Sequence, residues 1–152
     1  MNRRYSVNII NTTWLSCTYE LNLRKEIILT NTCIHSMEVS PYEDMDKALR
    51  CFELLATVFV EHFRGKLRKD ELEEKLLRDN IEYARGTSNI TQGITGEYDC
   101  AYKNEYFKLD KHLKVGNSRD PKRLLRIYFE WIPQRGKIII CHAGKHKKTR
   151  NN

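Results

Sequence analysis

Polar and apolar residues alternate in two short stretches near the N-terminus, residues 4–10 and residues 16–23. Alternation with a period of two is typical of half-buried strands, so we predict a strand in each stretch. A third strand is expected in residues 26–34. The apolar residues that support these strands are Tyr5, Val7, Ile9, Cys17, Tyr19, Leu21, Leu23, Ile27, Ile28, Leu29 and Ile34.

The next stretch has apolar residues three and four positions apart, which predicts a helix with one buried stripe. Ser40, Pro41 and Glu43 indicate its start: serine suits the N-cap, proline the first turn, and glutamate a capping box. Gly65 indicates its end. The stripe, which we expect in the core, consists of Met45, Ala48, Leu49, Phe52, Leu55, Ala56, Phe59 and Phe63.

A second, shorter helix is expected from about Arg68 to Asp79. Leu72 and Leu76 would face inward, and Asn80 could cap its C-terminus. Residues 84–96 are rich in Gly, Ser and Thr and predict a loop. Its glycines do not have the spacing of a phosphate-binding loop.

The C-terminal third is β-like. Tyr98 to Leu109 is rich in aromatic residues, and Arg123 to Ile132 alternates in the manner of a strand. A turn at 133–136 and a last strand from Lys137 to His142 complete a hairpin. In the 123–132 strand, one face would carry Leu125, Ile127, Phe129 and Trp131, and the other Leu124, Arg126, Tyr128 and Glu130.

The order is therefore three strands, two helices and three strands. Strands separated from helices predict an α+β fold, with N-terminal strands, a two-helix layer and a C-terminal antiparallel sheet. The 152 residues fit one domain, residues 1–152, in which the helical pair covers one face of the sheet.

Charge changes this picture because it is unevenly distributed. The net charge is +7, yet residues 1–97 contain 13 basic and 15 acidic side chains, whereas residues 98–152 contain 14 basic and five acidic ones. This asymmetry favours a surface that attracts a polyanion, with residues 145–152 as a flexible basic tail. The alternative is charge that only maintains solubility.

Five cysteines, an odd number without CxxC spacing, make a disulfide framework unexpected and favour a reducing compartment. No stretch reaches the roughly 20 apolar residues of a membrane span. The first residues lack the apolar run of a signal peptide. We therefore expect a cytoplasmic protein without a membrane partner.

The closing hairpin and the tail carry the candidate binding residues. Lys and Arg side chains neutralise phosphates, and a tyrosine can stack on an unpaired base, so RNA or another polyanion is the expected partner. The candidate residues are Lys122, Arg123, Tyr128, Lys137, Lys145, Lys147, Lys148 and Arg150.

Three further residues are candidates for catalysis. His142 and His146 could transfer protons near neutral pH, and Arg126 could stabilise charge on a phosphorane. RNA could then be cut without a metal or other cofactor. Cys141 and His142 would point to opposite faces of a strand, and no zinc-type spacing is present, so no metal site is expected.

The closing hairpin resembles that of RelE/HigB-type toxins (the ParE/RelE superfamily), small bacterial proteins of toxin–antitoxin pairs. The residues concerned are Leu125 to Phe129, Lys137 to Ile140, and Lys147-Lys148-Thr149. The resemblance implies a strand, two helices and a three-stranded antiparallel run, cleavage of mRNA, and an acidic antitoxin-like partner. It also implies that Arg126 stabilises charge and that His142 or His146 acts near the C-terminus.

Three functions remain open from the sequence. The first is an RNA-directed, toxin-like protein, a metal-independent mRNA endoribonuclease. The second is a non-catalytic accessory protein that binds nucleic acid or protein in a phage–host conflict system. The third is a binder of small phosphorylated ligands, with residues 86–96 as a lid.

Overall fold

A computed structural model describes residues 24–86, 99–117 and 119–145, and its centre is a five-stranded mixed sheet. The strand order is β1-β7-β6-β5-β2; β1 runs parallel to β7, and the other neighbours are antiparallel. Their bounds are Ile27–Leu29 for β1, Glu82–Arg85 for β2, Lys111–Val115 for β5, Leu125–Ile132 for β6 and Lys137–Gly144 for β7. The α+β prediction is confirmed. The predicted strands 4–10 and 16–23 lie outside the described residues.

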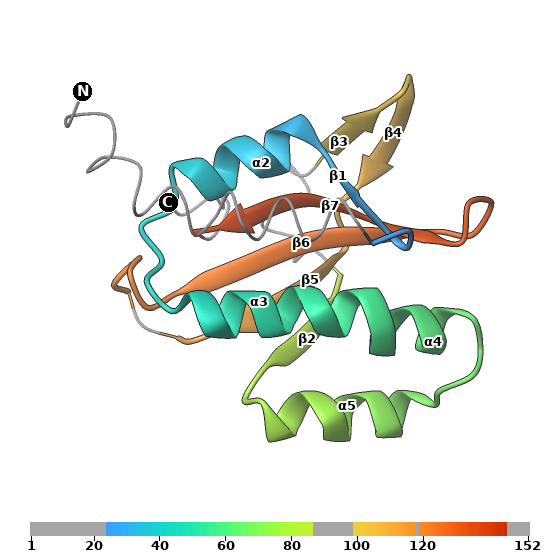
Figure 1. Ribbon diagram of the computed structural model, residues 1–152, viewed down its shortest axis with the longest axis horizontal. Coiled ribbons are helices and arrows are strands. Elements are labelled where there is room, and N and C mark those ends of the chain that lie inside the picture. Colours follow the sequence, from blue (N-terminus) through green and yellow to red (C-terminus); the bar gives the residue numbers. More distant parts are fainter. Residues whose placement is uncertain (1–23, 87–98, 118, 146–152) are drawn as a thin grey trace.

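Helices α3 (Met45–Leu54), α4 (Val60–Phe63) and α5 (Lys69–Arg78) lie on one side of this sheet (Figure 1). A π-helical turn, η1 (Leu55–Phe59), joins α3 to α4. Their apolar stripe meets one face of the sheet in the larger core, as predicted. Phe59, fully buried, contacts Phe129 at 5.3 Å between ring centroids.

The start of the first long helix differs from the prediction. It begins at Met45, because the side chain of Asp44 accepts a hydrogen bond from the Lys47 backbone N–H and so acts as the N-cap. The Ser40 hydroxyl is buried and accepts from the Tyr42 N–H instead. A carboxylate four residues later therefore replaced the expected serine cap.

The predicted strand 26–34 is also wrong in its second half. β1 ends at Leu29, and α2 (Asn31–Glu38) follows at once. Thr30 caps this helix by accepting from the Cys33 N–H. Beyond the end of β1, α2 takes over the edge of β7: the Ser36 hydroxyl accepts a hydrogen bond from the Ala143 N–H at 3.0 Å.

The second helix and its end match the prediction. Leu72 and Leu76 of α5 are buried, and Asn80 follows the helix with a φ of 55°. The N–H of Asn80 donates to Leu77 O, and that of Ile81 to Leu76 O, which is the hydrogen-bond pattern of a Schellman cap. This cap turns the chain directly into β2, a strand that the sequence pattern did not reveal.

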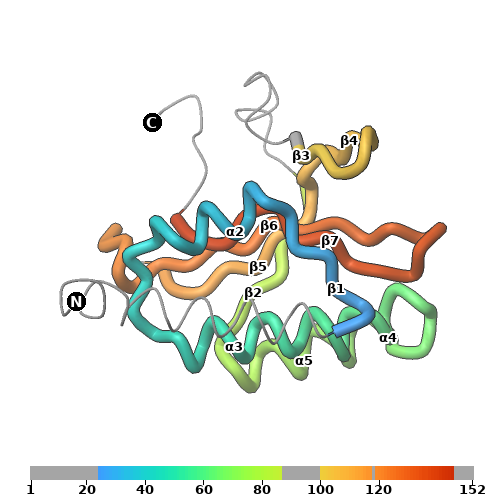
Figure 2. The backbone as a smooth tube through the Cα atoms, turned by 45° about the horizontal axis from the view of Figure 1, so that its top comes forward, coloured from blue at the N-terminus to red at the C-terminus, as the bar shows by residue number. Residues whose placement is uncertain are grey.

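The opposite face of the sheet is covered in part by a separate hairpin of β3 (Asp99–Tyr102) and β4 (Glu105–Lys108). Figure 2 shows this hairpin on the side of the sheet away from α3 and α5. It contributes Cys100 and Phe107 to a second, smaller core with Tyr128, Ile132 and Ile139.

A disulfide joins Cys100 of this hairpin to Cys141 of β7, with 6.0 Å between their Cα atoms. The expectation that the cysteines stay unpaired is therefore wrong for this pair. The two residues are 41 positions apart, and only the folding of the hairpin onto the sheet brings them together. Cys33 and Cys51 are free and buried.

The β6–β7 hairpin is confirmed, with its turn at 133–136; β6 begins at Leu125, two residues later than predicted. In the predicted β-like region, residues 99–102 and 105–108 form β3 and β4. None of the helices in the described part of the chain is long and apolar enough to cross a membrane.

Candidate functional site

Two rows of side chains cross β5, β6 and β7 on the face of the sheet away from the helices. In the first row, which we name the aromatic row, His112, Tyr128 and His142 are direct partners across the three strands. In the second, the cationic row, Lys114 lies opposite Arg126, and Gly144 follows on β7. Because the rows are two residues apart along each strand, they form one continuous surface.

The aromatic row is packed ring to ring. The His112 and Tyr128 rings are stacked with 5.0 Å between centroids, and the Tyr128 and His142 rings meet edge to face at 5.7 Å. Tyr128 is buried, whereas both imidazoles are partly exposed. Two imidazoles thus flank one phenol.

A β-bulge sets the position of His142. Tyr128 pairs with His142, but Phe129 pairs with Ile140, so Cys141 is an extra residue on β7. Cys141 joins the small core that contains Tyr128, and His142 contacts the Tyr128 ring. The expectation that Cys141 and His142 point to opposite faces is therefore wrong, because the bulge interrupts the alternation.

The imidazole of His142 is oriented by the chain that follows it. Its Nε2 lies 2.7 Å from the carbonyl oxygen of Lys145. A carbonyl can only accept, so Nε2 carries the hydrogen, and the neutral ring has its lone pair on Nδ1. In this tautomer Nδ1 is the basic atom of His142.

Arg126 is the buried member of the cationic row, with 8 % of its surface exposed. Its Nη1 donates to the carbonyls of Val115, Gly116 and Leu125 at 3.0–3.2 Å. Its Nε is buried without a hydrogen-bond partner, and no carboxylate of the described chain forms an ion pair with it. Burial lowers the pKa of the guanidinium, but an arginine stays charged at neutral pH.

Lys114 places a second positive charge directly opposite Arg126. Like charges at opposed positions of an antiparallel pair destabilise the sheet. The ammonium of Lys114 lies 3.4 Å from a carboxylate oxygen of Glu82 on β2, whose side chain is 70 % exposed. Solvent screens such an exposed pair, so Glu82 compensates the two cations weakly.

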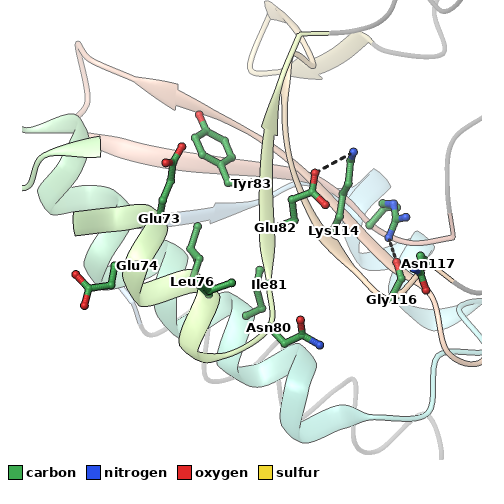
Figure 3. Close-up of a pocket in the computed structure, with 12 residues that line it drawn as sticks. Glu73, Glu74, Leu76, Asn80, Ile81, Glu82, Tyr83, Lys114, Gly116 and Asn117 are labelled. Carbon is green, nitrogen blue, oxygen red and sulfur yellow. Dashed lines mark hydrogen bonds and ion pairs between the residues drawn. The ribbon is translucent and has the colours of Figure 1, made fainter. Parts of the chain in front are cut away.

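A groove of about 780 Å³ opens beside this row and around the start of β2 (Figure 3). Arg126, Lys114, Gly116 and Asn117 line its end on the sheet, and residues of α5 and β2 line the rest. Such a volume is within the range of ligand-binding pockets. The arrangement can accept an anion at the guanidinium and the ammonium, and it can supply two imidazoles beside them.

The structure brings some of the predicted residues together and separates others. Lys122, Arg123 and Lys145 lie at the end of the hairpin that carries Arg126, and all three are exposed. Lys122 is 3.9 Å from a carboxylate oxygen of Glu43. Lys137 is at the opposite end of β7, roughly 20 Å away at about 3.3 Å per residue. Outside the described residues lie His146, Lys147, Lys148 and Arg150.

Sequence reasoning missed His112 and Lys114 as members of this site. Their signal was present in residues 111–115, where Lys, His, Leu, Lys and Val alternate as in a strand. Leu113 and Val115 pack in the larger core, which turns His112 and Lys114 to the other face. Recognising this strand would have placed both residues beside Arg126 and Tyr128.

Across residues 24–86, 99–117 and 119–145, no three His, Cys, Asp or Glu side chains are placed to hold a metal ion. Comparison with known proteins finds no family model, no characterised protein and no solved structure that matches this chain.

Proposed function

We propose that this protein is an RNA-directed, toxin-like endoribonuclease that cuts without a metal ion. The observation that carries the proposal is the cationic row beside the aromatic row: Arg126, buried and without an ionic partner, opposite Lys114. A buried cation without an anion costs free energy, and two opposed cations add to that cost. A bound phosphate would offset both.

RNA binding would start at the exposed basic residues at this end of the hairpin. The side chains of Lys122, Arg123 and Lys145 would attract the phosphate backbone of the RNA. One phosphate of the RNA would then enter the groove and bind Arg126 and Lys114. A phosphate accepts two parallel hydrogen bonds from a guanidinium, and the buried, unpartnered Nε of Arg126 would donate one of them once the side chain turns toward the groove. The exposed basic residues would supply affinity for RNA, and the buried Arg126 would fix the position of the bound phosphate.

Cleavage would follow by transfer of the phosphodiester to the neighbouring 2′-oxygen. One imidazole of the aromatic row takes the 2′-OH proton, the 2′-oxygen bonds to phosphorus, and the bond to the 5′-oxygen breaks. A protonated imidazole gives that oxygen its proton, leaving a 2′,3′-cyclic phosphate and a 5′-OH. His112 and His142 stand on strands two spacings apart, roughly 10 Å, one on each side of the Tyr128 ring, and a phosphate held at the neighbouring cationic row would lie beside this row. His146 remains a further candidate for one of these roles.

The biological setting of the proposal is that of RelE/HigB-type toxins: action on mRNA in the cytoplasm, with an acidic antitoxin-like protein as inhibitor. The basic C-terminal third supports this setting, since it would attract both RNA and an acidic protein. The resemblance of the 125–140 hairpin supports it as well.

The test is cleavage of a single-stranded RNA by the purified full-length chain in excess EDTA. We expect a 2′,3′-cyclic phosphate at the new end and no cleavage where the 2′-OH is replaced by hydrogen. The His142→Gln and Arg126→Gln variants should each lose at least ~100-fold in rate. RNA that stays intact with the wild-type chain would contradict the proposal.

Two lysines provide a matched pair of variants for RNA binding. Lys114→Gln removes a charge from the cationic row, whereas Lys137→Gln removes one at the far end of the same sheet. We expect Lys114→Gln to weaken RNA binding about tenfold and to lower its salt dependence by about one ion, and Lys137→Gln to do neither. Equal effects would mean that binding follows total charge and not this site. Salt-sensitive binding without cleavage would instead favour the non-catalytic accessory protein.

A further inference from the structure

The Cys100–Cys141 disulfide is the covalent cross-link between the β3–β4 hairpin and the central sheet, which the hairpin also contacts through the small apolar core. Cys100 is in β3 of the separate hairpin, and Cys141 is the extra residue of the β7 bulge, directly before His142. The disulfide is therefore one residue from a member of the aromatic row. It also lies in the same small core as Tyr128.

The β3–β4 hairpin depends on such a connection. It has two short strands and forms no strand pairing with the five-stranded sheet. A two-stranded hairpin is marginally stable by itself. Near its turn, Arg135 forms an ion pair with Glu105 at 3.3 Å and lies over the Tyr102 ring, 5.6 Å from its centroid. These contacts are exposed and weak compared with a covalent bond.

The bulge at Cys141 also requires an interaction that stabilises it. A bulge leaves an extra residue unpaired and locally disrupts the ladder. The side chain of Cys141 is 1 % exposed, so the buried sulfur anchors this residue beneath the hairpin. The anchor fixes the direction in which the next residue, His142, leaves the bulge toward Tyr128.

We propose that Cys100 and Cys141 are a redox-controlled positioning pair: their disulfide clamps the β3–β4 hairpin onto the sheet and holds His142 against Tyr128. Reduction releases the hairpin and lets the bulge move. The structural part of this proposal is independent of RNA; its effect on cleavage rests on the proposed function.

The chemistry is thiol–disulfide exchange with a low-molecular-weight thiol such as glutathione. On closure, one protein thiolate attacks the disulfide form of the small thiol and expels one small thiol; the second protein thiolate then breaks the mixed disulfide and expels the other. Two protein thiols are oxidised and one small disulfide is reduced. In a reducing cytoplasm the open form would prevail, and oxidising conditions would close it.

Burial of Cys100 and Cys141 limits how fast a reductant can reach their disulfide. Cys100 is 5 % and Cys141 1 % exposed, so a reductant reaches the sulfurs only when the hairpin lifts from the sheet. The disulfide, once formed, opposes that lifting. The clamped form should therefore persist after the oxidant is removed.

The cationic row is held by other contacts. Arg126 is fixed by three backbone carbonyls, none of which belongs to the hairpin or to the bulge. Reduction should therefore leave the affinity for RNA unchanged and act on proton transfer alone. This separation distinguishes a positioning pair from a disulfide that only stabilises the fold.

The experiment uses the full-length chain, equilibrated in glutathione buffers from reducing to oxidising, with peptide mass mapping to follow the Cys100–Cys141 bond. Amide exchange in residues 99–108 and the His142 ring signals report the clamp. We expect amide exchange at least ~10-fold slower in the oxidised form and shifted His142 signals on reduction. The kcat for RNA cleavage should fall about tenfold on reduction, with KM unchanged.

The Cys100→Ala/Cys141→Ala double variant is the control. It should behave as the reduced protein and ignore the glutathione ratio, which excludes an effect through the remaining cysteines. Identical hairpin exchange and His142 signals in both redox states would overturn the proposal, as would a cleavage rate that rises on reduction. If neither form cuts RNA, the proposed function fails, but the hairpin and His142 signals still decide whether the clamp exists.

Discussion

The two faces of the central sheet differ in the kinds of side chain that they carry. The face toward α3 and α5 is mainly apolar: Leu113, Ile127 and Phe129 are fully buried against the helices. The opposite face mixes a small core with two histidines, Lys114 and the buried Arg126. The same strands contribute to both faces, so the difference lies in alternate residues and not in the elements.

This difference indicates what each face is for. Apolar packing is favourable in the free protein, whereas Arg126 lacks both an ionic partner and a bond to its Nε within the described chain. Elsewhere in the sheet, buried Lys111 has Glu130 as its ion-pair partner. The sheet can therefore compensate a buried cation, and at Arg126 it does not. We infer that the helix-covered face maintains the fold and that the other face is kept for a ligand.

The strongest test of the helix-covered face is Phe59→Ala. Phe59 is fully buried and contacts Phe129 and Tyr83 edge to face, at 5.3 and 5.1 Å between centroids. We expect the free energy of unfolding to fall by about 3–5 kcal/mol, measured by urea denaturation. Exposed Tyr106→Ala is the control and should cost little. A loss below about 1 kcal/mol would mean that this face is not the main source of stability.

Gly116→Ala tests the loop that supports the other face. Gly116 has a φ of 74°, and an added Cβ would lie 2.3 Å from the carbonyl oxygen of Arg123. Since the carbonyl of Gly116 accepts from Arg126, the backbone would have to move at the cationic row. We expect a loss of about 3 kcal/mol together with weaker RNA binding.

Gly65→Ala is the matched control for this variant. Gly65 also has a positive φ, 80°, but an added Cβ would meet nothing within 4 Å. Only the backbone strain remains, about 1 kcal/mol, and RNA binding should be retained. If both variants lose equal stability, the contact with Arg123 does not constrain the loop.

The sequence predicted the parts of the fold that local patterns determine. Leu72 and Leu76 marked the buried side of α5, and Asn80 its end, because helical spacing and caps depend on neighbouring residues. The β6–β7 hairpin was predictable for the same reason, from alternation on both sides of a short turn.

The features that the sequence pattern did not predict depend on contacts between segments that are distant along the chain. Ile34 looks like a strand residue, but α2 is stabilised by Thr30 at its start and by a hydrogen bond that Ser36 accepts from Ala143 of β7, 107 positions away. The disulfide spans 41 residues. The bulge at Cys141 follows from the pairing of β6 with β7, and no local signal reveals it. The aromatic row became visible only once β5 was placed beside β6.

Arg126→Met tests whether the sheet face away from the helices carries a charge that lowers the stability of the free protein but binds RNA. An uncompensated buried charge is costly, and replacing buried charged groups by apolar side chains of similar volume is often neutral or stabilising when the whole set of charges is removed. We expect the free energy of unfolding to rise by about 1 kcal/mol while RNA affinity is lost. Leu125→Ala, one residue earlier on the helix-covered face, should instead cost 2 kcal/mol or more. A destabilised Arg126→Met variant would mean that the guanidinium mainly serves the structure through its hydrogen bonds to the carbonyls of Val115, Gly116 and Leu125.

The smallest expected effect concerns Tyr83, on the helix-covered face, and the dependence of stability on alkaline pH. Burial raises the pKa of Tyr83 to about 12, whereas in the unfolded chain a tyrosine titrates near pH 10. Between these values the unfolded chain has lost the proton that the folded protein keeps, so stability falls as the pH rises from about 10 to about 12. Tyr83→Phe should change stability at pH 7 by about 0.5 kcal/mol or less and should make this alkaline decline shallower in urea titrations. Tyr106→Phe, at an exposed position on β4, should leave the decline as it is. An unchanged decline in Tyr83→Phe would mean that the Tyr83 hydroxyl is solvated despite its contacts with Phe59 and Phe129.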